Sequence, residues 1–345
     1  MNYCKYAALL LLLSFQAVAQ IGGSNTYNFL DLTAAARTAA LGGTFISVKD
    51  NDLNLALQNP SLLNPSMDGE LALGAVSYFG GITYGDAAFA VDKKAVGTFM
   101  ASIHYVDYGS FTETDNTAAI LGSFKASEYA FSLGWAHPFA DSLFSIGAQI
   151  RFIDSQLYLY NSYGLAGDIS ATYYDSEREW TIALVARNIG SQIKTYTPQN
   201  NEPLPLEVMA AASKRLKHVP FRFTITARHL EQWDISYIDP TTATVVDPIT
   251  GQTTYTTISF GDKLMRHFIF SGEILLSKNF HLRVAYNDEQ KAEMSIPTAS
   301  SGAGWSFGFG LKIYHFQLSY GRAIYSIAGG SNFFSLTTNI HDFIH

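Results

Sequence analysis

Bulky apolar residues alternate with small or polar ones in many short segments of this chain. Between residues 305 and 313, for example, Trp305, Phe307 and Phe309 alternate with Ser306 and Gly308, and the same pattern recurs at 129–135, 144–152, 180–184 and 221–228. Successive side chains of a strand point to opposite faces, so the pattern predicts β-strands with one bulky face and one small face. After residue 19 no apolar run reaches the roughly 18 residues that a membrane-spanning helix needs. If the chain enters a membrane, it must therefore do so as a closed barrel.

The composition agrees with many short strands joined by turns, because aromatic residues make up 14% of the chain and Gly occurs 27 times. In a soluble sandwich the face opposite the apolar one is usually rich in Lys, Glu and Thr. Here that face is often Gly, Ser and Ala. We therefore predict an all-β transmembrane antiparallel β-barrel with a crowded or plugged lumen. A secreted soluble β-protein is the alternative, because periodicity alone does not identify the outer face.

The alternation gives about 14 strands, an even number. They start near Leu71, Ile82, Val96, Glu128, Leu143, Gly164, Trp180, Leu206, Phe221, His267, Phe280, Gly304, Phe316 and Phe333. Short links such as 92–94, 175–178 and 314–315 alternate with longer ones at 107–126, 154–163, 189–203, 233–262 and 288–301. Short periplasmic turns and long external loops are typical of barrels in the outer membrane of a Gram-negative bacterium, so both termini are expected in the periplasm.

The first 19 residues have the features of a secretory signal peptide. Lys5 precedes an apolar run, and Ala17, Val18 and Ala19 supply a small-x-small cleavage site. The alternative is an N-terminal membrane anchor, although the run is too short to span a bilayer. Cleavage after Ala19 would remove Cys4, the one cysteine, and would exclude disulfides and thiol chemistry. The expected organisation is a signal peptide at 1–19, a hatch or plug segment at 20–69 and an outer-membrane barrel at 70–345.

The net charge of -7 argues against a nucleic-acid partner, because phosphate binding needs a basic face. The five longer links contain twelve Asp and Glu but only three Lys. Ordinary solvated loop charge explains this excess. The functional alternative is an acidic rim that binds a basic partner, or lipopolysaccharide through divalent cations.

Residues 27–67 do not alternate and predict a different kind of structure. Asp31 is expected to cap a short helix that runs through the Ala-rich stretch 34–41 and stops at Gly42 and Gly43. A helix of about ten residues is marginal alone, and its Ala surface permits close approach to a wall of Gly and Ser in the barrel lumen. Arg37 should find a carboxylate or backbone carbonyls there, because an unpaired buried charge is costly.

This segment also carries a resemblance to a known family. The motifs are the run 28–32, the run 36–43 with Arg37, Gly42 and Gly43, the polar stretch 50–52, and Asn59 with Pro60. Together they resemble the hatch of the FadL and PorV group of outer-membrane barrels, and within it the PorQ-like components of the type IX secretion system. Ser61 stands where many relatives have Ala.

The resemblance implies a non-enzymatic outer-membrane component that anchors a cell-surface attachment complex, which retains or processes secreted cargo. The partners it implies are a PorZ-like surface protein, PorU and PorV, beside outer-membrane lipid and lipopolysaccharide. The alternative function is a FadL-like channel for hydrophobic small molecules. A channel needs an apolar pocket, and the small, polar inner faces of the clearest strands offer little apolar lining.

No catalytic, cofactor or metal site is predicted. The Gly-x-Ser-x-Gly string at 304–308 lies in a strand with no helix after it, and the nine His lack metal-ligand spacing. A phospholipase-like pair of Ser102 or Ser132 with His104 is left open. The charged side chains expected in the lumen are interpreted as ion pairs that fix the hatch, or alternatively as the lining of a solute path. These are Arg151, Arg187, Arg222, Arg228 and Arg283, with Glu207 and Glu273.

Overall fold

A computed structural model of the chain describes residues 25–139, 143–236, 244–246, 253–255, 257–294, 302–326 and 329–343. The predicted signal peptide and its cleavage site lie outside the described residues. Within the link 233–262, residues 237–243, 247–252 and 256 also lie outside them.

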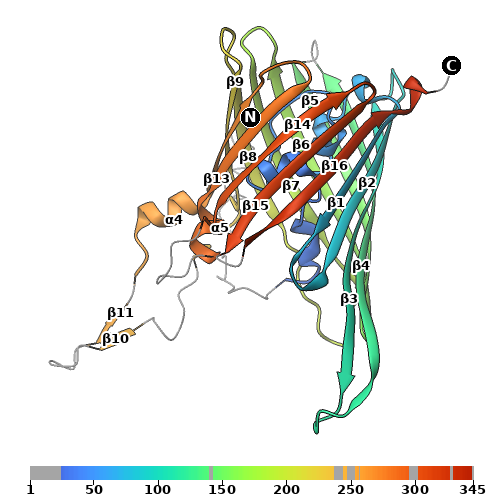
Figure 1. Cartoon of the computed structure of the whole chain (residues 1–345), viewed down its shortest axis with the longest axis vertical. Helices are drawn as coiled ribbons and strands as arrows, with labels where there is room; N and C mark the ends of the chain where they lie inside the picture. The colour runs from blue at the N-terminus through green and yellow to red at the C-terminus, as the bar shows by residue number, and fades with distance from the viewer. Residues whose placement is uncertain are drawn as a thin grey trace, which may run out of the picture.

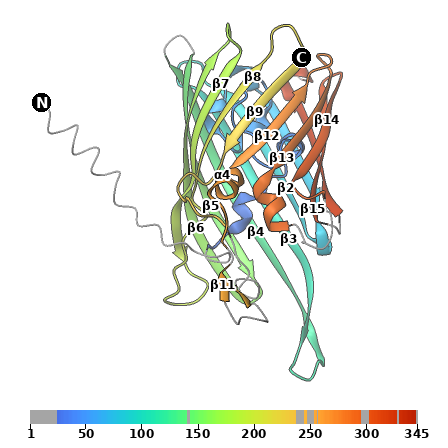
Figure 2. The same cartoon turned by 90° about the vertical axis from the view of Figure 1, so that its left-hand side faces the viewer.

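Fourteen antiparallel strands form one closed barrel, as the alternation predicts (Figures 1 and 2). Each barrel strand pairs with the barrel strands that precede and follow it in the sequence. The first barrel strand pairs with the last, which closes the sheet. The barrel strands are β1 (Glu70–Ser77), β2 (Thr83–Asp92), β3 (Thr98–Thr114), β4 (Ile120–Phe139), β5 (Phe144–Leu157), β6 (Tyr160–Asp175), β7 (Trp180–Lys194), β8 (Glu207–Arg215), β9 (Phe221–Ala227), β12 (Phe268–Ile274), β13 (Phe280–Asn287), β14 (Trp305–Ile313), β15 (Phe316–Ser326) and β16 (Gly329–Asn339).

The remaining elements are short. A separate two-stranded sheet pairs β10 (Thr244–Val246) with β11 (Thr253–Tyr255). The helices are η1 (Asn28–Asp31), α2 (Ala36–Ala40), α3 (Leu53–Ala56), η2 (Pro60–Leu62), η3 (Pro65–Met67), η4 (Phe79–Gly81), α4 (Phe260–Arg266), α5 (Asp288–Met294) and η5 (Ile340–Asp342). None of the described helices has both the length and the apolar character that crossing a bilayer requires.

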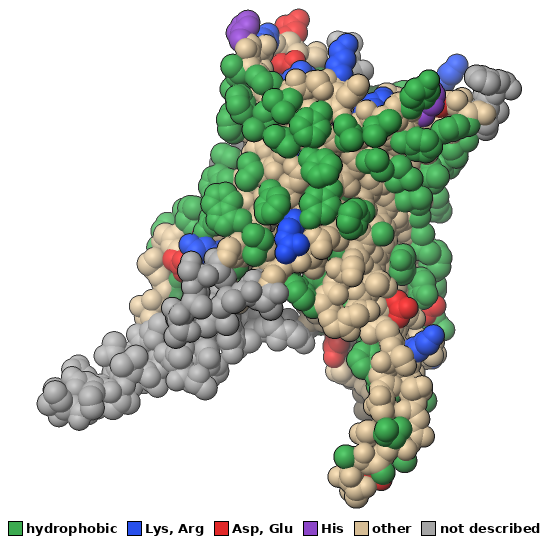
Figure 3. Space-filling view, in the orientation of Figure 1, with side chains coloured by type: hydrophobic (Ala, Val, Ile, Leu, Met, Phe, Trp, Pro, Cys, Tyr) green, Lys and Arg blue, Asp and Glu red, His purple; other side chains and the backbone are tan. Residues whose placement is uncertain are grey.

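The structure identifies the outer face of the barrel. Along β14, Trp305, Phe307 and Phe309 are exposed, whereas Ser306 and Gly308 are buried. The same alternation of exposed bulky and buried small residues runs along β5 and β6. Figure 3 shows the resulting apolar belt on one side of the molecule, with charged side chains gathered mainly toward its two ends. An apolar exterior around a closed barrel is the arrangement that lipid requires, so the chain is a membrane barrel rather than a soluble sandwich.

Two of the five expected long loops are largely strand, and a third is strand in its first part. β3 and β4 pair from Thr98 to Thr114, with register shifts after Asp107 and after Glu113, and leave only residues 115–119 as a turn. β5 and β6 pair up to a two-residue turn at 158–159, and β7 continues to Lys194. The sequence analysis did not predict these extensions, because it identified strands by the alternation of apolar residues. Beyond the lipid belt both faces of a hairpin can be polar while the backbone ladder continues.

The described ends of the chain lie at opposite ends of the barrel. Thr26 N–H donates to the Pro203 carbonyl at 2.9 Å, beside the β7–β8 connection, which belongs to the end with the longer hairpins. Asp342 instead accepts from His315 in the short β14–β15 turn, with 2.9 Å between Oδ2 and Nδ1. The prediction that both termini lie in the periplasm concerns residues outside those described and stays a prediction.

Candidate functional site: the hatch and the lumen

The segment from η1 to η3 threads the barrel and fills much of its interior (Figure 2). Its helices are shorter than expected, because α2 covers only five residues and begins after Ala35, which provides no side-chain cap. Asp31 is not the helix cap that was predicted. It ends η1, and its carboxylate accepts hydrogen bonds from Arg187 and Asn188 on the barrel wall. Tertiary ion pairing thus takes the place of local capping.

The Ala-rich helix α2 packs directly on a wall of Ser and Gly, as its composition predicts. Ser306 and Ser271 donate hydrogen bonds to the Ala40 and Leu41 carbonyls at 3.2 and 2.9 Å, which satisfies the helix end. At Gly321 there is no room for a side chain, since a Cβ atom would lie 2.4 Å from the Ala36 carbonyl oxygen. The helix is therefore held by contacts between backbone and small side chains.

Gly42 and Gly43 end α2 with φ angles of 94° and 89°, a region that favours glycine. Gly43 N–H donates to the Thr38 carbonyl at 3.0 Å. The Gly42 carbonyl accepts from the Asn287 amide at 3.1 Å. The turn thus fastens the hatch to the end of β13.

Asn59 and Pro60 form a second anchor on the opposite side of the lumen. Asn59 is fully buried, its amide donates to the Ile46 carbonyl at 2.7 Å and to Thr172 Oγ1 at 3.1 Å, and its oxygen caps Ser61 N–H at 3.0 Å. Pro60 occupies the first turn of η2, where its missing N–H costs nothing. A Cβ atom at Gly147 would lie 2.2 Å from the Ser61 nitrogen, so the wall must be glycine at this contact.

Arg37 lies at the centre of a buried charge cluster. Its Nε donates to Glu273 Oε1 at 3.0 Å, and its Nη1 donates to Asp50 and Asp52 at 2.8 and 3.1 Å. Glu273 also accepts from two wall residues, Arg222 at 2.6 Å and Arg283 at 3.3 Å. Three guanidinium groups thus face three carboxylates, which balances charge in a site that water hardly reaches. Arg37 has the carboxylate partners that its position predicted.

A second cluster surrounds Glu207 near the longer-hairpin end. Glu207 accepts from Arg187 Nε at 2.8 Å and from Arg228 Nε at 2.6 Å, and Arg187 also pairs with Asp31 of the hatch at 3.0 Å. Arg228 continues the network to Glu289 of α5 at 3.2 Å. This cluster joins the hatch, the wall and the β13–β14 connection.

His229 extends this second cluster, just beyond the end of β9. Burial alone would lower the pKa of its imidazole, but hydrogen bonds to Glu231 and Glu289 outweigh burial and raise that pKa to about 10. The distances are 3.2 Å from Nδ1 to Glu231 and 3.3 Å from Nε2 to Glu289. His229 is therefore a cation at neutral pH and helps to hold α5 over the lumen.

A further lumenal arginine, Arg151, pairs within the wall. It donates to Asn188 Oδ1 at 2.6 Å and forms an ion pair with Asp168 of β6. The sequence analysis did not predict that Asp31, Asp50, Asp52 and Asp168 pair with the lumenal arginines. The polar stretch 50–52 was visible as a motif, but nothing local shows which cation it meets.

His104 lies where the sequence left a serine-histidine pair open. Its Nδ1 is hydrogen-bonded to Asp86, and the Phe29 ring of the hatch stacks on the imidazole with 5.7 Å between ring centres. Ser102 and Ser132 line the same cavity of about 50 Å³ as His104. Such a space holds little more than one or two waters. The arrangement therefore fixes the hatch and has no room for a lipid substrate.

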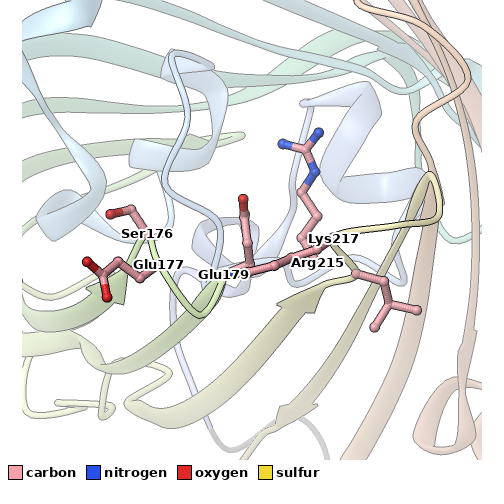
Figure 4. A pocket seen from close by; sticks show the side chains of 6 residues that line it. Ser176, Glu177, Glu179, Arg215 and Lys217 are labelled. Carbon is pink, nitrogen blue, oxygen red and sulfur yellow. The ribbon is translucent and has the colours of Figure 1, made fainter.

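Larger cavities lie toward the two ends of the barrel. One of about 330 Å³ adjoins the second charge cluster, with Arg228, His229 and Glu289 on one side and Tyr84, Tyr325 and Phe333 among its apolar lining. A polar cleft of about 440 Å³ lies between two short turns, lined by Glu177, Glu179, Arg215 and Lys217 among others (Figure 4). Within the described part of the chain, no three His, Cys, Asp or Glu side chains are grouped so as to hold a metal ion.

No protein-family profile and no curated protein matches this chain. Solved structures do match. The toluene transporter TodX of Pseudomonas putida aligns with a TM-score of 0.52 and 13% identity over 90% of this chain and 99% of that one. The chain has the fold of TodX. A TodX deltaS2 mutant, described as a monoaromatic hydrocarbon channel, gives a TM-score of 0.50 and 12% identity over 89% of this chain and 97% of that one.

A FadL homologue of Pseudomonas aeruginosa gives a TM-score of 0.46 and 13% identity over 90% of this chain and 98% of that one. At such identities the likeness concerns the fold. The TodX match agrees with the expected closed barrel preceded by N-terminal helices. The two TodX structures are named a hydrocarbon channel and a toluene transporter.

Proposed function

We propose that the chain is a plugged, non-enzymatic outer-membrane barrel of the type IX secretion system, which holds a surface complex that retains or processes secreted cargo. One structural observation carries the proposal. The hatch is fastened inside the barrel at α2, at Asn59 and through two buried charge clusters. A lumen filled in this way suits a rigid anchor, which needs no open passage. The partner class, a PorZ-like surface protein with PorU and PorV, comes from the resemblance of the hatch motifs.

The β3–β4 hairpin offers a docking element for such a partner. It projects beyond the rest of the barrel (Figures 1 and 2). Ile120 and Leu121 near its tip are 75% and 64% exposed. Lower down, Phe124 packs on Phe111 and Tyr158, with ring centres 5.2 and 4.6 Å apart, which stiffens the hairpin base. Exposed apolar residues on a stiff projection are typical of protein contact sites.

A second function, a channel for hydrophobic small molecules, has its own support. TodX, whose fold this chain has, is named a toluene transporter, and these comparisons favour a channel over a secretion component. The cavity of about 330 Å³ beside the hatch includes Tyr84, Tyr325 and Phe333 in its lining and has the size of a small-ligand pocket. For this function the hatch must move, because its ion pairs close the lumen below the cavity.

Deletion of the protein separates the two functions. In the attachment role, deletion should release surface proteins into the medium, and re-expression of the full chain should restore their retention. Replacement of residues 110–122 by a short turn should fail to restore retention while heat-dependent gel mobility shows a folded barrel. The channel role predicts instead that deletion abolishes uptake of toluene or a similar hydrocarbon while surface proteins stay attached.

A further inference from the structure

The outer wall formed by β14, β15, β16 and β1 contains an apolar groove of about 590 Å³. Four of the side chains that line it, those of Leu73, Phe309, Leu318 and Phe334, are between 40% and 57% exposed. The lining also includes Ala75 and Leu336. The groove lies on the face that the apolar belt assigns to lipid. A recess on this face will hold a lipid chain or another apolar segment.

Arg322 lies just beyond this groove, two residues along β15 from Tyr320, which lines it, and it occupies an outward-facing position. Along β15, Ser319, Gly321 and Ala323 are buried, so Arg322 shares the opposite face with Leu318 and Tyr320. In the sheet it lies between Phe307 of β14 and Asn332 of β16. The cation thus interrupts a wall of apolar side chains.

The pairing of Arg322 differs from that of the lumenal arginines. Its Nη1 donates to the Asn332 amide oxygen at 2.8 Å, and the same oxygen accepts from Tyr320 at 2.8 Å. Among the described residues no carboxylate pairs with Arg322, whereas Arg37, Arg187 and Arg228 each contact at least two. A neutral amide leaves the charge uncompensated. A guanidinium in contact with lipid is costly unless an anion meets it, and its planar donors match a phosphate.

The position along the strand selects the kind of lipid. Leu318 is near the start of β15, at the short-turn end, and Arg322 is farther along toward the longer-hairpin end. The groove therefore runs from Arg322 toward the short turns. In outer-membrane barrels the longer connections face outside. A head group at Arg322 then belongs to the outer leaflet, and its acyl chain descends along the groove.

We propose that Arg322 and this groove bind one lipid A molecule of the outer leaflet, with a phosphate on the guanidinium and an acyl chain against Leu318 and Phe334. The site is independent of which function the lumen and hairpins serve. It adds a specific lipid contact to the general apolar belt.

Two variants test the two halves of the site in the full-length protein. Arg322→Gln removes the charge, and Ala75→Trp fills the groove beside Phe334 without changing charge. Lys214→Gln is the matched control, because Lys214 also faces outward but lies over Trp180 at the short-turn end. Each detergent-purified protein is titrated with diphosphoryl lipid A, and bound lipid is counted by native mass spectrometry. Heat-dependent gel mobility shows that each variant is folded.

Arg322→Gln should weaken lipid A binding by roughly tenfold to a hundredfold, the worth of one charged hydrogen bond. Ala75→Trp should also weaken it, and Lys214→Gln should leave it unchanged. Equal binding by the wild type and Arg322→Gln overturns the proposal. Phosphatidylglycerol bound as tightly as lipid A overturns the assignment of the lipid. A dimer that Ala75→Trp disrupts, without any lipid A bound to the wild type, replaces the lipid with a second copy of the chain.

Discussion

Glu273→Gln tests whether the buried charge cluster holds the hatch in place. Glu273 is 1% exposed and accepts hydrogen bonds from Arg37, Arg222 and Arg283. Glutamine keeps the shape but removes the charge and turns one acceptor into a donor. That donor would face guanidinium N–H groups, which also donate. Three cations would then be left with Asp50 and Asp52 as counter-charges.

We expect Glu273→Gln to lower the free energy of unfolding by about 3–5 kcal/mol, the usual cost of breaking a buried pair from one side. The double variant Glu273→Gln with Arg283→Met restores equal numbers of charges. Arg283 has no carboxylate partner besides Glu273 among the described residues. The double variant should therefore lose about 1–3 kcal/mol less than the sum of the two single losses.

Urea unfolding in lipid vesicles measures the stability, and limited proteolysis reports release of the hatch. Arg178→Gln serves as the control, because the Arg178 side chain is 79% exposed and lies 3.7 Å from Asp175. Its loss should stay below about 1 kcal/mol. A loss of the same small size for Glu273→Gln, with the hatch still resistant to protease, would refute the assignment of this cluster as the hatch anchor.

Three further outcomes follow from the structure. Gly147→Val should lower the thermal midpoint of the gel-mobility shift by displacing Ser61, whereas Gly272→Ala should be tolerated, since the nearest atom to its Cβ would be 3.8 Å away. Because the pKa of His229 is raised from 6.5 to about 10, its stabilising effect is complete below pH 6.5 and is lost as the pH rises to 10. The stability difference between the wild type and His229→Gln should therefore shrink over that range in pH-dependent unfolding, and a constant difference would contradict the ion pairs. Mass spectrometry of the exported protein should find Gln20 at the N-terminus, and an intact Met1 would exclude cleavage after Ala19.

The sequence alone predicted the barrel and its strands, because their signal is local. Alternation with a period of two is set by strand geometry, so each segment such as 305–313 shows its own two faces. The need of Arg37 for a partner was equally predictable, because a buried cation must be paired wherever it lies. The Ala residues of α2 and the Gly and Ser residues of the barrel wall also predicted that the helix would pack closely on the wall.

Only the tertiary structure decided which groups meet. Arg37 and Glu273 are 236 residues apart, and no local pattern connects them. The structure turned Asp31 from an expected helix cap into a partner of Arg187, because a lumenal guanidinium competes better for a carboxylate than a helix N–H does. It also extended the hairpins past the lipid belt, where strand pairing persists although the apolar signal ends. Long-range pairing and the lipid boundary are properties of the closed barrel, which is why the sequence of one segment does not contain them.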